Sequence, residues 1–184
     1  SREEIVREIY NVDFPDEFYL FEKWCIVGNL DLSLQWLHHP WELIVPLERG
    51  GPSEKVGRWS EEQEKNAFSQ APHVVLLMEL CAGEAIYDDY FIGYDLNELS
   101  EGRTTIVGHE DDIPESGAKF EIIGSSMLEV LHAWMSDHYR MVQAQYNKPS
   151  NRGMGSLDEE DVEEAAEQLR GIEAMQAELA SKTI

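Results

Sequence analysis

Histidines and carboxylates are the residues of this chain that could do acid–base or metal chemistry. His109 opens an acidic run that ends at Asp112, and such a run could hold a cation in a loop. The run lacks the glycine and the ligand spacing of a calcium loop. Glu129 and His132 stand three residues apart, which is half of a di-iron arrangement whose second copy the sequence does not contain. We therefore expect neither a metal site nor a cofactor.

Serine and cysteine chemistry finds no better support. Cys25 and Cys81 share no CxxC or metal-ligand spacing and stand among apolar neighbours, so we expect buried thiols. Ser125 and Ser126 stand where a helix is predicted to begin, and capping accounts for them. The sequence has no phosphate-binding glycine loop and no G-x-S-x-G motif. It therefore predicts a protein that is not an enzyme.

Negative charge is the dominant chemical property of the sequence. The chain of 184 residues has 37 acidic and 14 basic residues, a formal charge of −23. Such a surface repels nucleic acids and anionic membranes but attracts cationic partners. High acidity also improves solubility, and this simpler explanation stays open. Residues 1–12 lack a signal-peptide pattern and no apolar run reaches membrane-spanning length, so we expect a cytoplasmic protein.

Helical patterns dominate the start of the chain. One helix is expected over Glu3–Tyr10, and a second begins at Pro15 and ends near Gly28. The apolar residues of the second helix form one face. Its acidic residues are expected outside that face: Asp16, Glu17 and Glu22.

The centre of the chain has β patterns. Leu30–His39 predicts only irregular structure or one helical turn. Strands are predicted over Trp41–Leu47, Pro72–Leu80, Ile86–Tyr94, Arg103–His109 and Ala118–Ile123. The short links between them favour an antiparallel meander. The sequence thus predicts an α+β fold, with an antiparallel sheet of about four to six strands and flanking helices.

Two further helices are expected after the last predicted strand. Ser126 and Glu129 form a capping box that starts a long helix, and Ser156 and Glu159 form another that starts an acidic one. The acidic helix has only a weak apolar stripe. These patterns divide the chain into an α+β domain over 1–148, a linker over 149–155 and an acidic C-terminal helix over 156–184.

Four short motifs stand in a familiar order: Phe14–Tyr19 (FPDEFY), Tyr90–Leu96 (YFIGYDL), Thr105–Glu110 and Gly124–Leu131 (GSSMLEVL). With the order of the elements, they resemble the SUKH superfamily, which includes bacterial immunity proteins and a yeast cell-wall regulator. With Trp41–Pro46, they are also similar to the N-terminal domain of the histone PARylation factor family. The resemblance covers residues 3–138 and does not extend to the acidic helix.

The SUKH resemblance implies a binding function. Its members share an α+β sheet with flanking helices, and many neutralise toxins, often nucleases, by direct association. A nuclease has a basic substrate groove, which an acidic protein can occupy. The PARylation factor contributes a catalytic carboxylate from a second domain, so that activity is not expected here.

We expect the partner-binding surface to combine acidic loops at one edge of the sheet with two tryptophans. The candidate residues are Asp88, Asp89, Asp95, Glu110, Asp111, Asp112, Trp36 and Trp41. The tryptophans would anchor a partner if exposed, although core positions also account for them.

The leading hypothesis is a non-enzymatic immunity protein that binds a basic toxin domain. One alternative is a regulatory scaffold or adaptor that binds another protein or forms a homodimer. The other is a metal-dependent enzyme that uses His109 and nearby acids.

Overall fold

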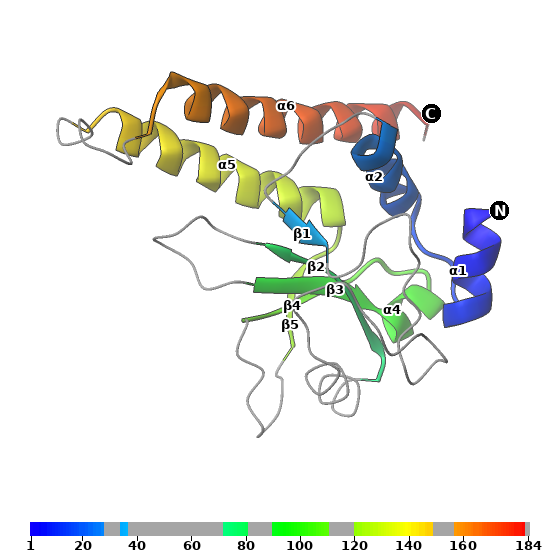
Figure 1. The fold of residues 1–184 in the computed structure, drawn as a ribbon. Coiled ribbons are helices and arrows are strands. Elements are labelled where there is room, and N and C mark those ends of the chain that lie inside the picture. The colour runs from blue at the N-terminus through cyan, green and yellow to red at the C-terminus, as the bar shows by residue number, and fades with distance from the viewer. Residues whose placement is uncertain (28–33, 37–71, 81–89, 111–119, 149–156, 183–184) are drawn as a thin grey trace, which may run out of the picture.

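The computed structural model describes residues 1–27, 34–36, 72–80, 90–110, 120–148 and 157–182 (Figure 1). Within these ranges the strands are β1 (Leu34–Trp36), β2 (Val74–Leu80), β3 (Tyr90–Asp95), β4 (Ile106–Glu110) and β5 (Glu121–Gly124). The helices are α1 (Arg2–Tyr10), α2 (Asp16–Val27), α4 (Leu96–Ser100), α5 (Met127–Tyr146) and α6 (Glu159–Lys182).

The five strands form one antiparallel sheet in the order β1-β2-β3-β4-β5, so each strand pairs with its neighbours along the chain. The α+β fold and the antiparallel sheet predicted from the sequence are confirmed. Register follows the alternation of side chains across the sheet. Tyr94 in β3 is opposite Val75 in β2 and Ile106 in β4, and all three side chains are buried on the same face.

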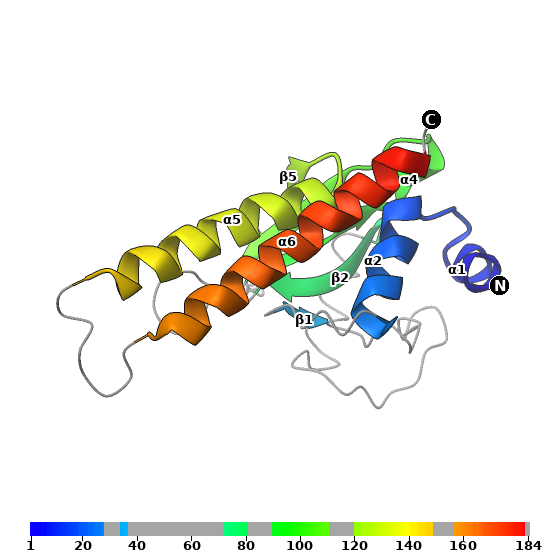
Figure 2. The same cartoon turned by 90° about the horizontal axis from the view of Figure 1, so that it is seen from above.

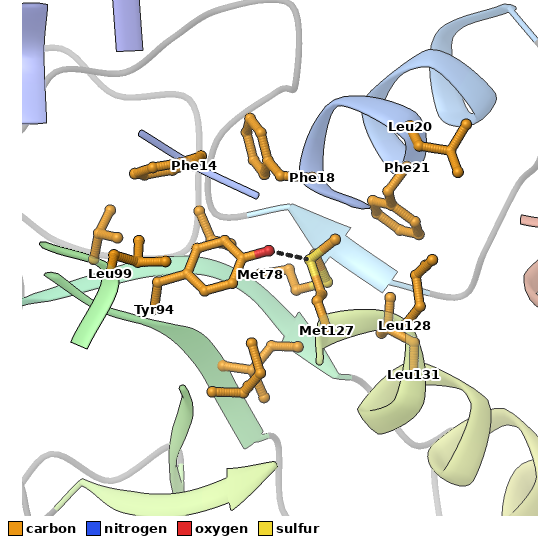
Figure 3. Close-up of a cluster of buried hydrophobic side chains, with 14 of the residues drawn as sticks. Phe14, Phe18, Leu20, Phe21, Met78, Tyr94, Leu99, Met127, Leu128 and Leu131 are labelled. Carbon is orange, nitrogen blue, oxygen red and sulfur yellow. Dashed lines mark hydrogen bonds between the residues drawn. The ribbon is translucent and has the colours of Figure 1, made fainter. Parts of the chain in front are cut away.

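Aromatic residues join this face of the sheet to the N-terminal segment. The Tyr94 ring lies 5.4 Å from the Phe14 ring and 6.5 Å from the Phe18 ring, with tilted or edge-on geometry. Figure 3 shows these rings with Met127 of α5, whose sulfur accepts a 3.7 Å hydrogen bond from the Tyr94 hydroxyl. Aromatic clusters of this kind contribute more than their buried area alone. The core therefore lies between the sheet, α2 and α5.

Helices α5 and α6 run antiparallel, side by side, over this face of the sheet (Figures 1 and 2). Ile172 and Met175 of α6 have no exposed surface and belong to the same hydrophobic core as Tyr94. The Trp24 indole of α2 also donates a 3.0 Å hydrogen bond to Glu178 of α6. Helix α6 is thus packed into the domain and is not a detached arm.

Two short elements differ from the sequence expectation. Leu34–Trp36, predicted as irregular or helical, pairs with β2 as an edge strand, and three residues are too few to show a period. The second element, α4, was not predicted at all. The Asp95 carboxylate starts it by accepting hydrogen bonds from the amides of Asn97 at 2.8 Å and Glu98 at 3.2 Å. The predicted strand at Trp41–Leu47 lies outside the described residues.

The expected solvent face of α2 is also wrong for two of its three acids. Glu17 and Glu22 are only 4% and 6% exposed, whereas Asp16 is exposed. The reason is that α2 packs against both α5 and α6 in addition to the core, so it has little free surface. Periodicity identifies one apolar face but does not show how many neighbours a helix has.

Candidate partner-binding surfaces

Strand register brings together the chain positions that border the predicted acidic loops. Tyr90 at the start of β3 is opposite Glu110 at the end of β4. In the sequence, Asp89 directly precedes Tyr90 and Asp111 directly follows Glu110. Both acidic segments are therefore joined to the same end of the sheet. The predicted site residues Asp88, Asp89, Asp111, Asp112 and Trp41 themselves lie outside the described ranges, so their clustering stays a prediction.

Asp95 lies at the other end of β3, opposite Val74. It stands five positions after Tyr90, which is roughly 16 Å along an antiparallel strand. Its carboxylate is already used as the cap of α4, and one oxygen is 3.8 Å from His73 Nε2. Asp95 and Glu110 therefore lie at opposite ends of the sheet. Trp36 ends the edge strand β1, opposite Met78.

A second acidic surface lies on the first half of α6. Its exposed acids are Asp158, Glu159, Glu160, Glu163, Glu164 and Glu167. The Asp158 carboxylate accepts hydrogen bonds from the amides of Glu160 at 2.8 Å and Asp161 at 3.2 Å, while Asp161 accepts one from the Asp158 amide at 2.7 Å. This pair caps the helix; the predicted cap, Ser156, lies outside the described part of the chain. Carboxylates at this end are also favoured by the helix dipole.

Several basic side chains are held by the chain's own carboxylates. Arg103 donates two hydrogen bonds to Glu98, at 2.7 and 2.9 Å. These bonds raise the pKa of its guanidinium above the already high value of a free arginine. Other ion pairs among the described residues include Arg7–Asp13, Lys23–Glu178, Arg140–Asp137, Arg170–Glu163 and Lys182–Glu178. Exposed pairs contribute little to stability. They do occupy cationic groups that an anionic partner would need.

The structure describes His73, His109, His132 and His138 but not His38 and His39. Among the residues that it describes, no group of three or more His, Cys, Asp and Glu side chains is arranged to hold an ion. His132 Nε2 lies 3.5 Å from Glu173 of α6, and the His109 ring packs edge-on against Phe120 at 5.5 Å. No helix in the described ranges is both long and apolar enough to cross a membrane.

The carboxylate of Glu17, which was expected to be exposed, is buried against the start of α5. Glu17 accepts hydrogen bonds from the Ser126 hydroxyl at 2.6 Å, the Met127 amide at 2.8 Å and the Leu128 amide at 3.4 Å. The Tyr94 hydroxyl is 3.5 Å away, and burial together with Glu17 raises the pKa of this phenol. Because Glu17 is engaged by the first amides of α5, we interpret it as structural. In the sequence, Glu17 stands within the FPDEFY motif, Phe14–Tyr19.

Comparison of the chain with family models, curated proteins and solved structures found no match. The fold and the surfaces together define an acidic α+β protein, in which a helical pair covers one face of a five-stranded meander.

Proposed function

We propose that this protein is a non-enzymatic binding module that captures a basic protein through its acidic surface. The formal charge of −23 carries the proposal, because a field of this size accelerates the approach of a cationic partner. The ion pairs of Arg7, Arg103 and Arg170 support it, since these groups are already occupied by carboxylates. The partner would meet a surface with acids in excess.

Within this proposal the partner is a toxin domain, such as a nuclease, in the cytoplasm. A nuclease must present a basic groove to its substrate, and an acidic protein that fills this groove excludes nucleic acid. The resemblance of Phe14–Tyr19 and Gly124–Leu131 to SUKH immunity proteins supports this choice of partner.

The scaffold hypothesis is less favoured in the form that uses the C-terminal helix as a separable arm. Ile172 and Met175 are fully buried in the domain core, so the face of α6 that carries them is not available to another protein. The scaffold would have to use the exposed surface of the whole domain.

Affinity capture from the native host tests the proposal. The protein is immobilised, and bound material is washed at low and then at high salt. We expect one basic protein to be retained at low salt and released at high salt, because screening weakens exposed charge interactions. Recovery of only the bait, or of an acidic protein that resists high salt, would contradict the proposal.

A further inference from the structure

Helices α5 and α6 lie against the rest of the domain along only part of their length. Figures 1 and 2 show the end of α5 and the start of α6 extending together beyond the strands of the sheet and beyond α2. We call residues 136–146 of α5 and 159–168 of α6 the distal half of this pair. The proximal half contains the start of α5 and the end of α6.

The proximal half is held by the hydrophobic core. Met135 of α5 and Ile172 and Met175 of α6 have no exposed surface and belong to the core of the domain. The hydrogen bond from Trp24 to Glu178 gives this end of α6 a further contact with α2. The two helices therefore cannot separate here without opening the core itself.

The distal half has much less apolar packing. Of its described side chains, Val142 and Ala165 are apolar and buried, and neither joins the core cluster that contains Ile172. The other buried side chain that α6 contributes to this half is the polar Gln168. Segments with few buried apolar contacts open locally while the rest of a protein stays folded. The distal half is therefore the part of the pair that opens first.

His138 is a half-buried titratable residue in this weakly packed half. Its ring stacks on Trp134 at 5.7 Å, and its Nδ1 atom is buried without a hydrogen-bond partner among the described residues. A protonated imidazole has an N–H group on both nitrogens. A buried N–H of a charged ring that has no acceptor costs more than the unpaired nitrogen of a neutral ring. Protonation of His138 is thus less favourable when the two helices are packed together than when they are apart.

Charged neighbours only partly offset this cost. The carboxylate of Glu164 on α6 raises the pKa of His138, but burial is the larger effect and lowers this pKa below its ordinary value of 6.5. On α5 itself, the adjacent Asp137 is paired with Arg140 at 2.9 Å. Acid therefore favours the state in which His138 is exposed to water.

A second histidine of α5 has the opposite setting. His132 lies in the proximal half, and its Nε2 atom is 3.5 Å from a carboxylate oxygen of Glu173 on α6. A proton on His132 adds an ion pair between the two helices at this end. Acid thus weakens the distal contact and does not weaken the proximal one through this histidine.

We propose that the distal half of the α5–α6 pair is an acid-opened arm, in which a proton on His138 separates residues 136–146 from residues 159–168 while the proximal half stays packed. The part of α6 that moves carries the second acidic surface, so mild acid changes how this surface is presented. The inference does not depend on the identity of a partner and therefore stands apart from the proposed function.

Hydrogen–deuterium exchange of the full chain at about pH 7.5 and about pH 5.5 tests this arm. The rates are corrected for the intrinsic effect of pH on amide exchange and expressed as protection. Uptake of one proton with an ordinary pKa of 6.5 can raise the opening constant by at most about tenfold over this range. We expect protection of the distal half to fall about threefold or more, and protection of residues 127–135 and 172–182 to stay constant.

Three variants identify the titrating group. His138→Gln has a polar side chain that does not titrate, so its distal half should have equal protection at both pH values. Glu164→Gln should enlarge the loss, because it removes the charge that raises the pKa of His138. His132→Gln is the matched control on the same helix and should leave the response of the distal half unchanged.

Equal protection of the distal half at both pH values in the wild type would overturn the inference. A loss that His138→Gln retains would also overturn it, as would an equal loss in both halves, which would mean that acid destabilises the whole domain. If His138→Gln does not fold, Glu164→Gln decides alone: a pH response no larger than that of the wild type would then overturn the inference.

Discussion

The carboxylate of Glu17 lies 2.8 Å from the backbone nitrogen of Met127, at the first residue of α5. The same carboxylate accepts a hydrogen bond from Ser126, the N-cap residue, while the Ser126 hydroxyl in turn accepts one from the Glu129 amide at 3.3 Å. The first amides of a helix have no partner within the helix, and its N-terminus favours negative charge. A side chain from the first turn of α2 thus fixes where the long helix α5 begins.

We expect Glu17→Ala to destabilise the protein by about 2–4 kcal/mol, because it leaves the Met127 amide buried without its acceptor. Glu17→Gln keeps one acceptor oxygen and should have a smaller effect. Urea unfolding followed by circular dichroism measures both. The matched control is Asp16→Ala, an exposed neighbour in the same turn, which should change stability by less than about 0.5 kcal/mol. Equal unfolding midpoints for Glu17→Ala and Asp16→Ala would show that Glu17 does not anchor α5.

Glu17 also shows how far the sequence could predict the fold. The Ser126 cap and the long helix after it follow from local signals, and the structure has both. The burial of Glu17 and Glu22 depends on how many elements surround α2, which no local pattern contains. Likewise, Leu34–Trp36 becomes a strand only because β2 supplies its hydrogen-bonding partner.

The candidate site also has parts that the sequence could predict and parts that depend on the topology. Tyr90 and Glu110 could be expected to meet, because short antiparallel connections place successive strand ends together. The predicted strand Ile86–Tyr94 ends directly before Asp95, so the sequence already indicated that Asp95 lies at the far end of β3, away from Glu110. The exposure of Ile122 depends on the position of β5 at the sheet margin, which is a property of the topology.

A second prediction concerns the packing of α6. Ile172→Ala should cost about 2–5 kcal/mol, the usual range for removing a fully buried aliphatic side chain. Glu167→Ala, on an exposed position of the same helix, is the control and should be near neutral. Deletion of residues 157–184 should abolish cooperative unfolding, because it also removes Met175 from the core. A deletion variant that still unfolds cooperatively at the wild-type midpoint would show that α6 is a dispensable arm.

A third prediction concerns pH. Burial lowers the pKa of His138, which stacks on Trp134 at 5.7 Å, and the nearby charge of Glu164 only partly offsets this. Between the lowered folded pKa and the ordinary value near 6.5, the unfolded chain binds more protons than the folded one. The contribution of His138 to stability is therefore complete above that ordinary value and is lost as the pH falls toward the folded pKa.

Thermal unfolding from neutral to mildly acidic pH measures this loss. His138→Gln should flatten the decline in stability, because the titrating group is absent. Glu164→Gln should make the decline steeper, because it removes the charge that raises the pKa of His138. Identical pH profiles for wild type and His138→Gln would exclude His138 as the cause.

The last prediction separates the two acidic surfaces. Asp88→Lys/Asp89→Lys changes the segment that enters β3, and Glu160→Lys/Glu167→Lys changes the exposed face of α6. Each exchange shifts the charge by two units, so both double variants have −19 in place of −23 and the same net charge as each other.

Stopped-flow association with the captured partner at low salt measures the difference between the two variants. If the partner docks at the end of the sheet where β3 begins, the Asp88→Lys/Asp89→Lys variant should associate about tenfold more slowly than wild type. The Glu160→Lys/Glu167→Lys variant should be slowed only about twofold, by its lower net charge. Equal slowing would mean that net charge alone steers binding, and faster association of the α6 variant than of wild type would contradict electrostatic capture itself.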